Sequence, residues 1–149
     1  MADAAERTLD VQYYIYREDD TSRLLSDAIM RAADRHVRVR VLLDDHGAIH
    51  KNLIAGLSGH PGIEVRVFNP FAYRGESRAL RFVELAFHAP RLRYRMHNKL
   101  FVADNAVALV GGRNVGDEYF QANPEFDFGD YDVFAAGPVV RELSKTFDE

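Results

Sequence analysis

Apolar and polar residues alternate along the chain with two different periods, and together they predict strands and helices in regular succession. Apolar residues at about every second position predict strands over Leu9–Tyr16, Val37–Leu43, Ile63–Val67 and Tyr131–Ala135. Helical spacing predicts helices from the capping residues Asp19–Ser22 to about Arg35, over Ile49–Leu57 and Glu76–His88, and after Gly137-Pro138. This succession predicts an α/β sandwich, a mixed β-sheet flanked by helices, in one domain over residues 1–149.

Finer features of the same pattern give three further expectations. Pro90 should close the third helix, because proline lacks the N–H that a helix interior needs. The last helix should bury one apolar stripe, formed by Val139, Val140, Leu143 and Phe147. The first strand should place Leu9, Val11, Tyr13 and Ile15 on one face, with Tyr14 and Tyr16 on the other. We interpret its three tyrosines as strand packing rather than as the wall of a substrate site.

Two short apolar stretches around Asp104-Asn105 predict a β-hairpin, because this residue pair favours tight turns. If the loop has two residues, Lys99 pairs with Val110 and His97 lies opposite Gly112. The register of the hairpin therefore decides which side chains meet at its open end.

The open end of this hairpin combines the residue types that phosphate chemistry needs. Side chains alternate along a strand, so His97, Lys99 and Phe101 share one face. Gly111-Gly112 can leave backbone N–H groups uncovered, and Asn114 follows two residues later. A nucleophile or base, a fixed cation and bare amide donors together predict a phosphate-handling site.

The same residues carry a family resemblance. His97-x-Lys99, Asp104, Gly111-Gly112 and Asn114 resemble the HKD signature of the phospholipase D superfamily, which implies a phospholipase D-like sandwich fold. Further segments are similar to the bacterial cardiolipin synthase branch in particular: Gly111–Phe120, Val41–Asp45, Glu64–Phe71, Asp132-Val133 and Gly137–Val140. The resemblance extends from about Leu9 to the end of the chain.

The resemblance implies a role for each residue of the motif. His97 would form a covalent phosphohistidine, while Lys99 and Asn114 would hold the phosphate oxygens. A carboxylate on the far ring nitrogen would fix the tautomer of His97. Asp132 is the candidate for that role by its match to the family, and Asp127 or Asp130 would be next.

The remaining motif residues have less direct expected roles. Asp104 belongs to the catalytic motif, yet at the turn we expect it to order the hairpin or to pair with Lys99. Gly111, Gly112 and Arg113 are the expected substrate-binding residues. Arg113 would contact either a substrate head group or an acidic neighbour in the Asp117-Glu118 segment. One histidine and one lysine without clustered carboxylates make a poor metal site, so we expect neither a metal nor another cofactor.

The chain departs from the family pattern in one respect. Cardiolipin synthase-type proteins carry two HKD motifs whose halves meet in one site, where one histidine attacks and the other acts as the acid. This chain has one such motif, so we expect it to be the N-terminal half of a longer protein. The alternative is a single-motif member that forms a homodimer about a two-fold axis. A monomer would lack the general acid and should be nearly inactive.

Charge and composition narrow the expected partners. The net charge of −4 argues against a surface that coats nucleic acid, and the absence of cysteine excludes disulfides and thiolate chemistry. The segment from Arg74 to Arg95 nevertheless holds six arginines and two glutamates, whereas six acids and no base lie between Gly116 and Asp132. The basic segment either attracts an anionic phospholipid substrate or is a solvated arginine face.

The expected cellular location follows from hydropathy. No run of about 18 apolar residues is present, so we expect no transmembrane segment in this chain. We expect it to be cytoplasmic or peripherally associated with the bacterial inner membrane. The helix predicted over Glu76–His88 is basic and amphipathic, so it either contacts a lipid surface or packs on the sheet as ordinary core.

The family resemblance therefore implies a phosphatidyltransferase or phospholipase of cardiolipin synthase type that acts through a phosphohistidine. The first alternative is a nuclease or another phosphodiesterase of the same superfamily. The second is a non-catalytic half that needs its partner domain.

Overall fold

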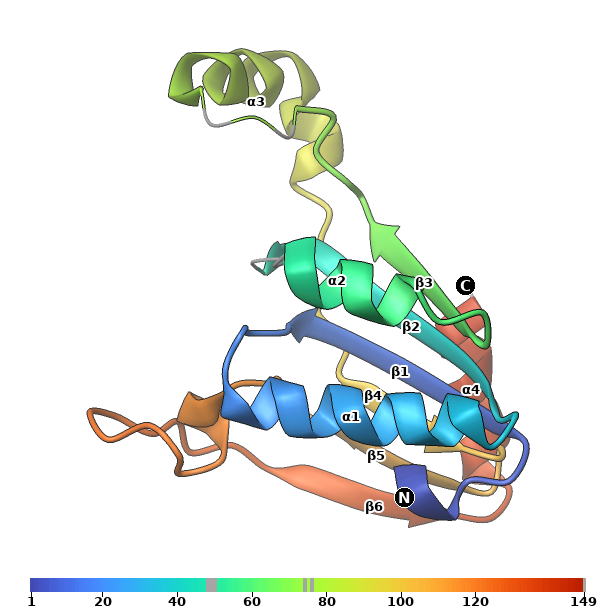
Figure 1. The fold of residues 1–149 in the computed structure, drawn as a ribbon. Helices are drawn as coiled ribbons and strands as arrows, with labels where there is room; N and C mark the ends of the chain where they lie inside the picture. Colours follow the sequence, from blue (N-terminus) through green and yellow to red (C-terminus); the bar gives the residue numbers. More distant parts are fainter. Residues whose placement is uncertain (48–50, 74, 76, 149) are drawn as a thin grey trace.

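A computed structural model describes residues 1–47, 51–73, 75 and 77–148 of the chain (Figure 1). Within these residues a single sheet has the strand order β3-β2-β1-β4-β5-β6. The strands are β1 (Thr8–Ile15), β2 (Arg38–Gly47), β3 (Ile63–Phe68), β4 (Leu100–Ala103), β5 (Val107–Gly111) and β6 (Asp132–Ala136). The first three strands are parallel and the last three join antiparallel, so the predicted mixed sheet is confirmed.

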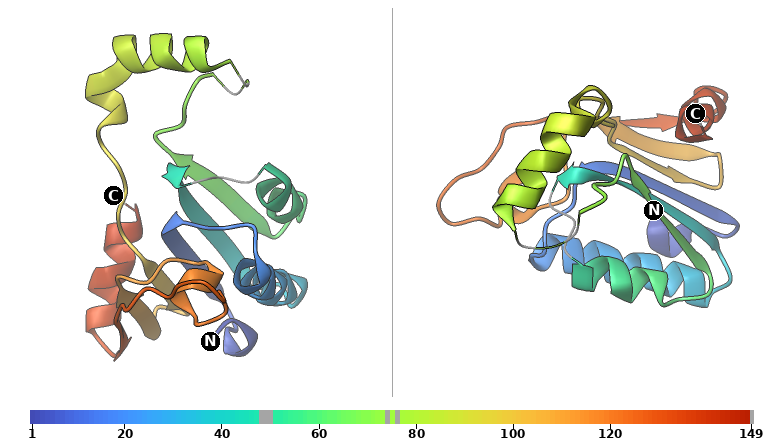
Figure 2. Two further views of the ribbon diagram at one scale, coloured as in Figure 1. Left: turned by 90° about the vertical axis from the view of Figure 1, so that its left-hand side faces the viewer. Right: turned by 90° about the horizontal axis from the view of Figure 1, so that it is seen from above.

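Helices cover both faces of this sheet, which confirms the predicted sandwich (Figures 1 and 2). The helices are α1 (Asp20–Asp34), α2 (Lys51–Ser58), α3 (Arg78–Leu92) and α4 (Val139–Asp148), with short 3₁₀ turns at Ala2–Ala4 and Asp117–Tyr119. The larger core lies between the sheet and α1 with α2, and includes Ile29, Val41 and Phe101. A smaller core lies under α4 and includes Val102 and Val140.

Helix α1 begins where the sequence predicts, and its first turn also fixes a loop near the motif. The Asp19 carboxylate accepts the Ser22 N–H at 3.0 Å and the Ser22 hydroxyl oxygen accepts the Asp19 N–H at 3.1 Å, which makes a capping box. Asp117 joins this cap, because its N–H donates to Asp19 at 2.8 Å and its carboxylate accepts the Thr21 N–H at 2.9 Å. The segment that follows the motif is therefore tied to the start of α1.

The register of the β4–β5 hairpin differs from the prediction by one residue. Ala103 pairs with Val107, so the loop has three residues, and the N–H of Gly111 donates to the Lys99 carbonyl at 3.3 Å. Asp104 and Asn105 both adopt positive φ angles, 56° and 51°, which Asp and Asn tolerate better than most residues. Lys99 consequently lies opposite Gly111 rather than Val110.

Three other expectations about the elements are wrong. Helix α3 runs through Pro90 to Leu92, because a proline near a helix end removes only one hydrogen bond, and the last turn bends away from the rest (Figure 1). Val139 is 52% exposed and does not join the stripe that α4 buries. In β1 the pairing shifts between Tyr13 and Ile15, which brings Tyr16 rather than Ile15 into the core. Ile49, Arg74 and Glu76 lie outside the described residues.

Helix α3 is placed unlike the other helices. Figures 1 and 2 show it standing apart from the sheet, joined to β3 and β4 by the chain on either side. Its N-cap is Ser77, whose hydroxyl accepts the Leu80 N–H at 3.5 Å. Helix α3 (Arg78–Leu92) therefore forms an arm beyond the sandwich rather than part of its covering.

Candidate active site

The strand that carries the motif is positioned by a buried carboxylate at the end of β2. The N–H of Met96 donates to Asp44 at 2.9 Å, and the Arg95 guanidinium lies 3.4 Å from the same carboxylate. Asp44 is 1% exposed, so this anchor is shielded from water. His97 follows directly, which fixes the backbone of the candidate nucleophile before β4 begins.

His97 and Lys99 meet at the open end of the hairpin. The Lys99 Nζ lies 3.0 Å from His97 Nδ1, 3.1 Å from Nε2 and 2.8 Å from the His97 carbonyl oxygen. A neutral imidazole has one unprotonated nitrogen, so the amine donates to one ring nitrogen at a time. The ring of Tyr14 packs 4.8 Å from the His97 ring and 5.4 Å below the Lys99 amine. The predicted pairing of a histidine with a cation on one face is present in the structure.

The Lys99 ammonium is buried without an acidic partner at hydrogen-bond distance. Its residue is 5% exposed, and within the described ranges it forms no ion pair. Burial lowers the pKa of Lys99, and the charge of Asp130 opposes that shift. A buried cation without an acidic partner is stabilised by any anion that binds beside it, and a phosphate oxygen of a substrate would be such an anion.

Asp104 lies at the other end of the hairpin. Its carboxylate accepts the N–H groups of Glu6 at 2.9 Å, Arg7 at 2.7 Å and Thr8 at 2.9 Å. Of the two roles expected for it, the structure supports ordering of the hairpin, whereas the pairing with Lys99 is not formed.

The two glycines do not offer bare amides, and this expectation is wrong. The Gly111 N–H donates to Lys99 and the Gly112 N–H donates to the Tyr131 carbonyl at 3.1 Å. A Cβ at Gly111 would collide with the Asp132 carboxylate, and one at Gly112 would collide with that of Asp130. The glycines are needed because they let these two carboxylates approach the hairpin.

Asp132 and Arg113 bind each other in the same corner of the site. The Arg113 N–H donates to Asp132 at 3.3 Å, and the two side chains form an ion pair at 3.6 Å. Arg113 also donates to the Asp130 carbonyl at 2.9 Å. Its acidic neighbour is thus Asp132 and not the Asp117-Glu118 segment. No hydrogen bond joins Asp132 to His97 in the part of the chain that the structure describes, so the role of Asp132 as the histidine's partner stays a prediction.

Asn114 joins the motif to the end of β1. It is 4% exposed, its Oδ1 accepts the Ile15 N–H at 3.0 Å and its Nδ2 donates to the Tyr119 hydroxyl at 3.0 Å. An amide nitrogen carries two hydrogens, so one donor of Asn114 is left for a ligand.

Two residues of this corner were not assigned to the site from the sequence. The sequence pattern predicts strand packing for Tyr14, and Asp44 belongs to the family resemblance without an expected role. Their contact with the motif depends on β1 pairing with β4 and on the approach of β2, which no local pattern reveals. The sequence feature that could have indicated a role for Asp44 is the polar pair Asp44-Asp45 at the end of an apolar strand.

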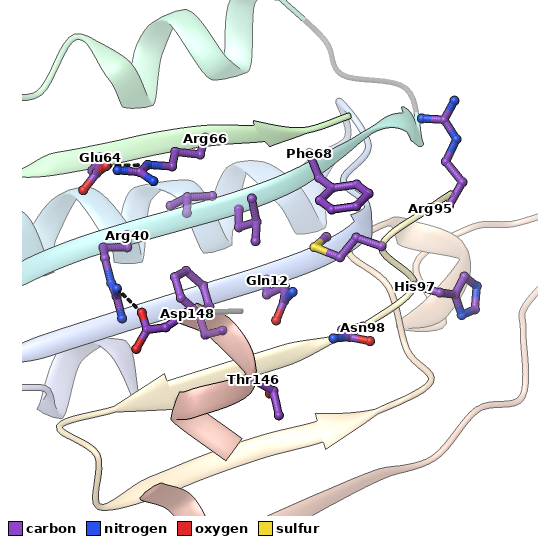
Figure 3. A pocket seen from close by; sticks show the side chains of 14 residues that line it. Gln12, Arg40, Glu64, Arg66, Phe68, Arg95, His97, Asn98, Thr146 and Asp148 are labelled. Atoms are coloured by element: carbon purple, nitrogen blue, oxygen red, sulfur yellow. Dashed lines mark hydrogen bonds and ion pairs between the residues drawn. The ribbon is translucent and has the colours of Figure 1, made fainter. Parts of the chain in front are cut away.

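A cavity of about 630 Å³ lies beside the motif on the face of the sheet that carries α4 (Figure 3). Arg40, which binds Asp10 at 2.7 Å, lies at one end of it and Asn98 at the other. The ring of His97 points away from Gln12 at the floor of the cavity (Figure 3). His97 and Asn98 are among the residues that line this cavity, whereas Lys99 is not, so the cavity reaches the pair at His97.

Two general properties of the described residues bear on cofactors and membranes. No three histidine or carboxylate side chains among them are grouped as metal ligands would be. None of their helices has both the length and the apolar content to cross a bilayer.

A family model described as "Cardiolipin synthase, PLD-like domain" matches residues 1–149. Over 148 residues the chain is 49% identical to Cardiolipin synthase C of Escherichia coli, covering 99% of this chain and 30% of that protein. Over 146 residues it is 36% identical to the Major cardiolipin synthase ClsA of Bacillus subtilis, covering 96% of this chain and 28% of that protein. The chain thus spans less than a third of the length of these relatives.

Solved structures show the same fold at low sequence identity. NucT from Helicobacter pylori matches with a TM-score of 0.67 and 14% identity, covering 99% of this chain and 80% of that one. A phosphatidylserine synthase from Haemophilus influenzae matches with a TM-score of 0.62 and 15% identity, covering 99% and 32% respectively. The phospholipase D family member Nuc from Salmonella typhimurium matches with a TM-score of 0.60 and 16% identity, covering 99% and 79%. The predicted family and fold class are both confirmed.

Proposed function

We propose that this chain, which belongs to the family of cardiolipin synthase phospholipase D-like domains, supplies one half of a site for phosphatidyl transfer. The observation that carries this proposal is the contact of the Lys99 amine with the His97 ring at 3.0 Å. The similarity to Cardiolipin synthase C and to ClsA supports phospholipids as the substrate class.

His97 is proposed as the nucleophile. A neutral imidazole has an unshared electron pair that can attack phosphorus. The nitrogen–phosphorus bond forms while the bond from phosphorus to the departing alcohol oxygen breaks, and that oxygen takes a proton from a general acid. A second alcohol then attacks the phosphorus of the phosphohistidine: its oxygen–phosphorus bond forms, the nitrogen–phosphorus bond to His97 breaks, and its proton returns to the group that acted as the general acid. Transfer to an alcohol and hydrolysis by water differ only in this second acceptor.

Lys99 and Asn114 are proposed to stabilise the charge that develops on the phosphate oxygens. The Lys99 amine lies 3.0 Å from a ring nitrogen of His97, so an oxygen of a phosphorus bonded to that ring would come within its reach, and the amine can exchange its contact with the ring for one with substrate. The second N–H of Asn114 adds a neutral donor from a rigid position. Arg113 is held by Asp132 close by and is proposed to meet the lipid head group. Asp104 would act on the reaction only by ordering the hairpin.

The proton donor for the departing alcohol is proposed to come from a second HKD half. The row of residues that holds Lys99, Gly111 and Asp132 is followed on the same face by Phe101, Leu109 and Phe134. Of this second row, Leu109 is 36% exposed and Phe134 is 59% exposed. An apolar surface continuous with an incomplete site suits a partner domain. The relatives' much greater length supports a partner in the same protein, with a homodimer as the alternative arrangement.

The proposal is tested by measuring assembly and turnover together. Light scattering gives the oligomeric state, and hydrolysis of a chromogenic phosphodiester and conversion of phosphatidylglycerol to cardiolipin give the activity. We expect activity only in a dimer or with a second half added, and its loss in His97→Ala. An inactive monomer that becomes active when the second half is added would support the alternative in which this chain is a half that needs its partner domain. Cleavage of DNA without any lipid turnover would instead favour the nuclease alternative.

A further inference from the structure

The polar side of α3 faces its own chain. Glu84 is 7% exposed, and its carboxylate accepts the N–H groups of Ala72 at 2.6 Å and Tyr73 at 3.0 Å. Arg91 donates to the Asn69 side chain at 2.5 Å. Hydrogen bonds of this kind hold the loop that follows β3 against the helix. They use the side of α3 that would face water in an ordinary surface helix.

The apolar side of α3 faces solvent. Four of its side chains are strongly exposed: Leu80 at 52%, Phe82 at 72%, Val83 at 48% and Phe87 at 79%. On a helix of 3.6 residues per turn these positions, with Ala79 and Ala86, cover about half of the circumference. This arrangement is the reverse of the one that α1 shows, where the apolar stripe is buried on the sheet. A continuous apolar face of this width on a protruding helix indicates that something covers it.

The charges around this face favour an anionic surface as the occupant. Arg78 on α3 and Arg93 just after it are exposed, whereas the Glu84 carboxylate is buried. The outward side of the arm thus presents cations beside its apolar side chains. Two copies of the arm would bring like charges together, which argues against pairing of α3 with itself. Anionic lipid head groups supply the opposite charge over an apolar layer.

The arm is also close to the candidate nucleophile along the chain. Arg93 caps the end of α3, and His97 follows four residues later. Four extended residues span at most about 14 Å. The Asp44 anchor holds Met96 between them, so the position of α3 and that of His97 are linked through a short segment.

We propose that α3 lies in the interfacial layer of an anionic bilayer, with Leu80, Phe82, Val83 and Phe87 among the acyl chains. The guanidinium groups of Arg78 and Arg93 would then lie at the level of the lipid phosphates. This inference deepens the proposed function and rests on it for the identity of the lipid as substrate. The binding itself follows from the helix and is measured without turnover.

A fluorescence experiment tests the insertion directly. The chain contains no tryptophan, so Phe87→Trp introduces a single indole on the proposed lipid face. Leu24→Trp is the matched control, since Leu24 is 71% exposed on α1. With vesicles of phosphatidylglycerol and phosphatidylcholine we expect a blue shift and at least twofold quenching by brominated acyl chains for Phe87→Trp alone. Equal behaviour of the two indoles, or no response from either at low salt, would overturn the inference.

A binding experiment tests the same face by substitution. Phe82→Asp/Phe87→Asp should reduce co-sedimentation with these vesicles at least tenfold, whereas Leu24→Asp should leave it unchanged. Far-UV circular dichroism and the thermal midpoint should match wild type, because the substituted face is not part of the core. Equal pelleting of the double variant and wild type would overturn the inference. So would light scattering that showed a dimer dissolved by the double variant without vesicle binding by wild type, since a second copy would then be the occupant.

The two proposals fail differently. Hydrolysis of a water-soluble chromogenic phosphodiester, in whichever assembly is active, does not need a membrane. Turnover without vesicle binding would remove the inference about α3 alone. Vesicle binding without turnover in any assembly would count against the proposed function and leave α3 as a lipid-binding helix.

Discussion

The two ends of the β4–β5 hairpin differ in whether the charged side chain there has partners in the fold. At the loop end, the Asp104 carboxylate accepts three backbone N–H groups and is fully engaged by the chain around it. At the open end, the Lys99 ammonium is buried with a histidine ring and a tyrosine ring, and none of the described carboxylates lies at hydrogen-bond distance from it. One hairpin thus contains a charge that the fold satisfies and a charge that it leaves available.

The pKa shifts of the two groups follow from these surroundings. Burial opposes ionisation of Asp104, but the N–H groups of Thr8, Glu6 and Arg7 outweigh it and lower its pKa. Burial also lowers the pKa of Lys99, and there it is the dominant cause. Folding therefore favours the charged form of Asp104 and disfavours the charged form of Lys99. A fold that keeps a disfavoured charge beside a nucleophile is typical of a functional site.

The largest expected effect is on turnover in His97→Ala. Removal of the attacking nitrogen should reduce the rate by more than about 10³-fold, equivalent to about 4 kcal/mol. The thermal midpoint should change little, because His97 is exposed and its ring is not part of either hydrophobic core. Turnover of the chromogenic phosphodiester and thermal denaturation measure the two effects. Asn98→Ala, at the exposed neighbouring position, is the control, and unaltered turnover in a folded His97→Ala protein would remove His97 from the mechanism.

The second effect concerns Lys99→Met, which should reduce turnover about 10²-fold through lost charge stabilisation. Lys99→Arg should restore only part of the rate, since guanidinium and ammonium differ in shape and reach. Because folding lowers the pKa of Lys99, the unfolded chain binds more protons between the folded-state pKa and 10.5. The wild type should therefore gain stability relative to Lys99→Met as pH rises through that range. Denaturant unfolding at several alkaline pH values measures this trend, and a wild type that loses stability there would contradict the assigned shift.

Features that depend on local patterns could be predicted from the sequence. The cap of α1 follows from the spacing of Asp19 and Ser22, and the approach of Lys99 to His97 follows from the two-residue period of an extended chain. The family resemblance rests on the spacing of the same motif and is confirmed across the whole chain. These predictions succeed because each depends on residues close together in sequence.

Features that depend on distant contacts could not be predicted. The three-residue loop follows from the bonds of Asp104 to the segment before β1, almost a hundred positions earlier, and it moves Lys99 opposite Gly111. The glycines are explained by carboxylates that arrive with β6, not by bare amides. The direction of α3 is a similar case, because its apolar arc fits a buried helix as well as an exposed one. In each of these cases the partner of the residue or element is absent from the local pattern.

The third effect is on stability rather than on rate. Asp104→Ala removes three charge-assisted acceptor contacts and should lower the free energy of unfolding by about 2 kcal/mol near neutral pH. Turnover per folded molecule should stay within about twofold of wild type. Because folding lowers the pKa of Asp104 from 3.8, its contribution is present above pH 3.8 and is lost as pH falls through the folded-state pKa. Urea unfolding between pH 7 and pH 2 measures this, and a stability difference that persisted unchanged at the acid end would exclude the carboxylate as its source.

The smallest expected effect is that of Asp132→Asn, which tests whether this carboxylate at the open end of the hairpin binds Arg113 or His97. In the structure the Asp132 carboxylate contacts Arg113, and an asparagine oxygen can still accept the Arg113 N–H. If that contact is its role, turnover should fall about tenfold or less, because only one partly exposed ion pair is lost. If Asp132 instead turns to hold the far nitrogen of His97 during the reaction, the wrong tautomer would cost up to about 10⁴-fold. The ring-nitrogen chemical shifts of His97 distinguish the two roles. Shifts that are identical in wild type and Asp132→Asn would exclude Asp132 as the partner of His97 and make Asp130→Asn the next variant to measure.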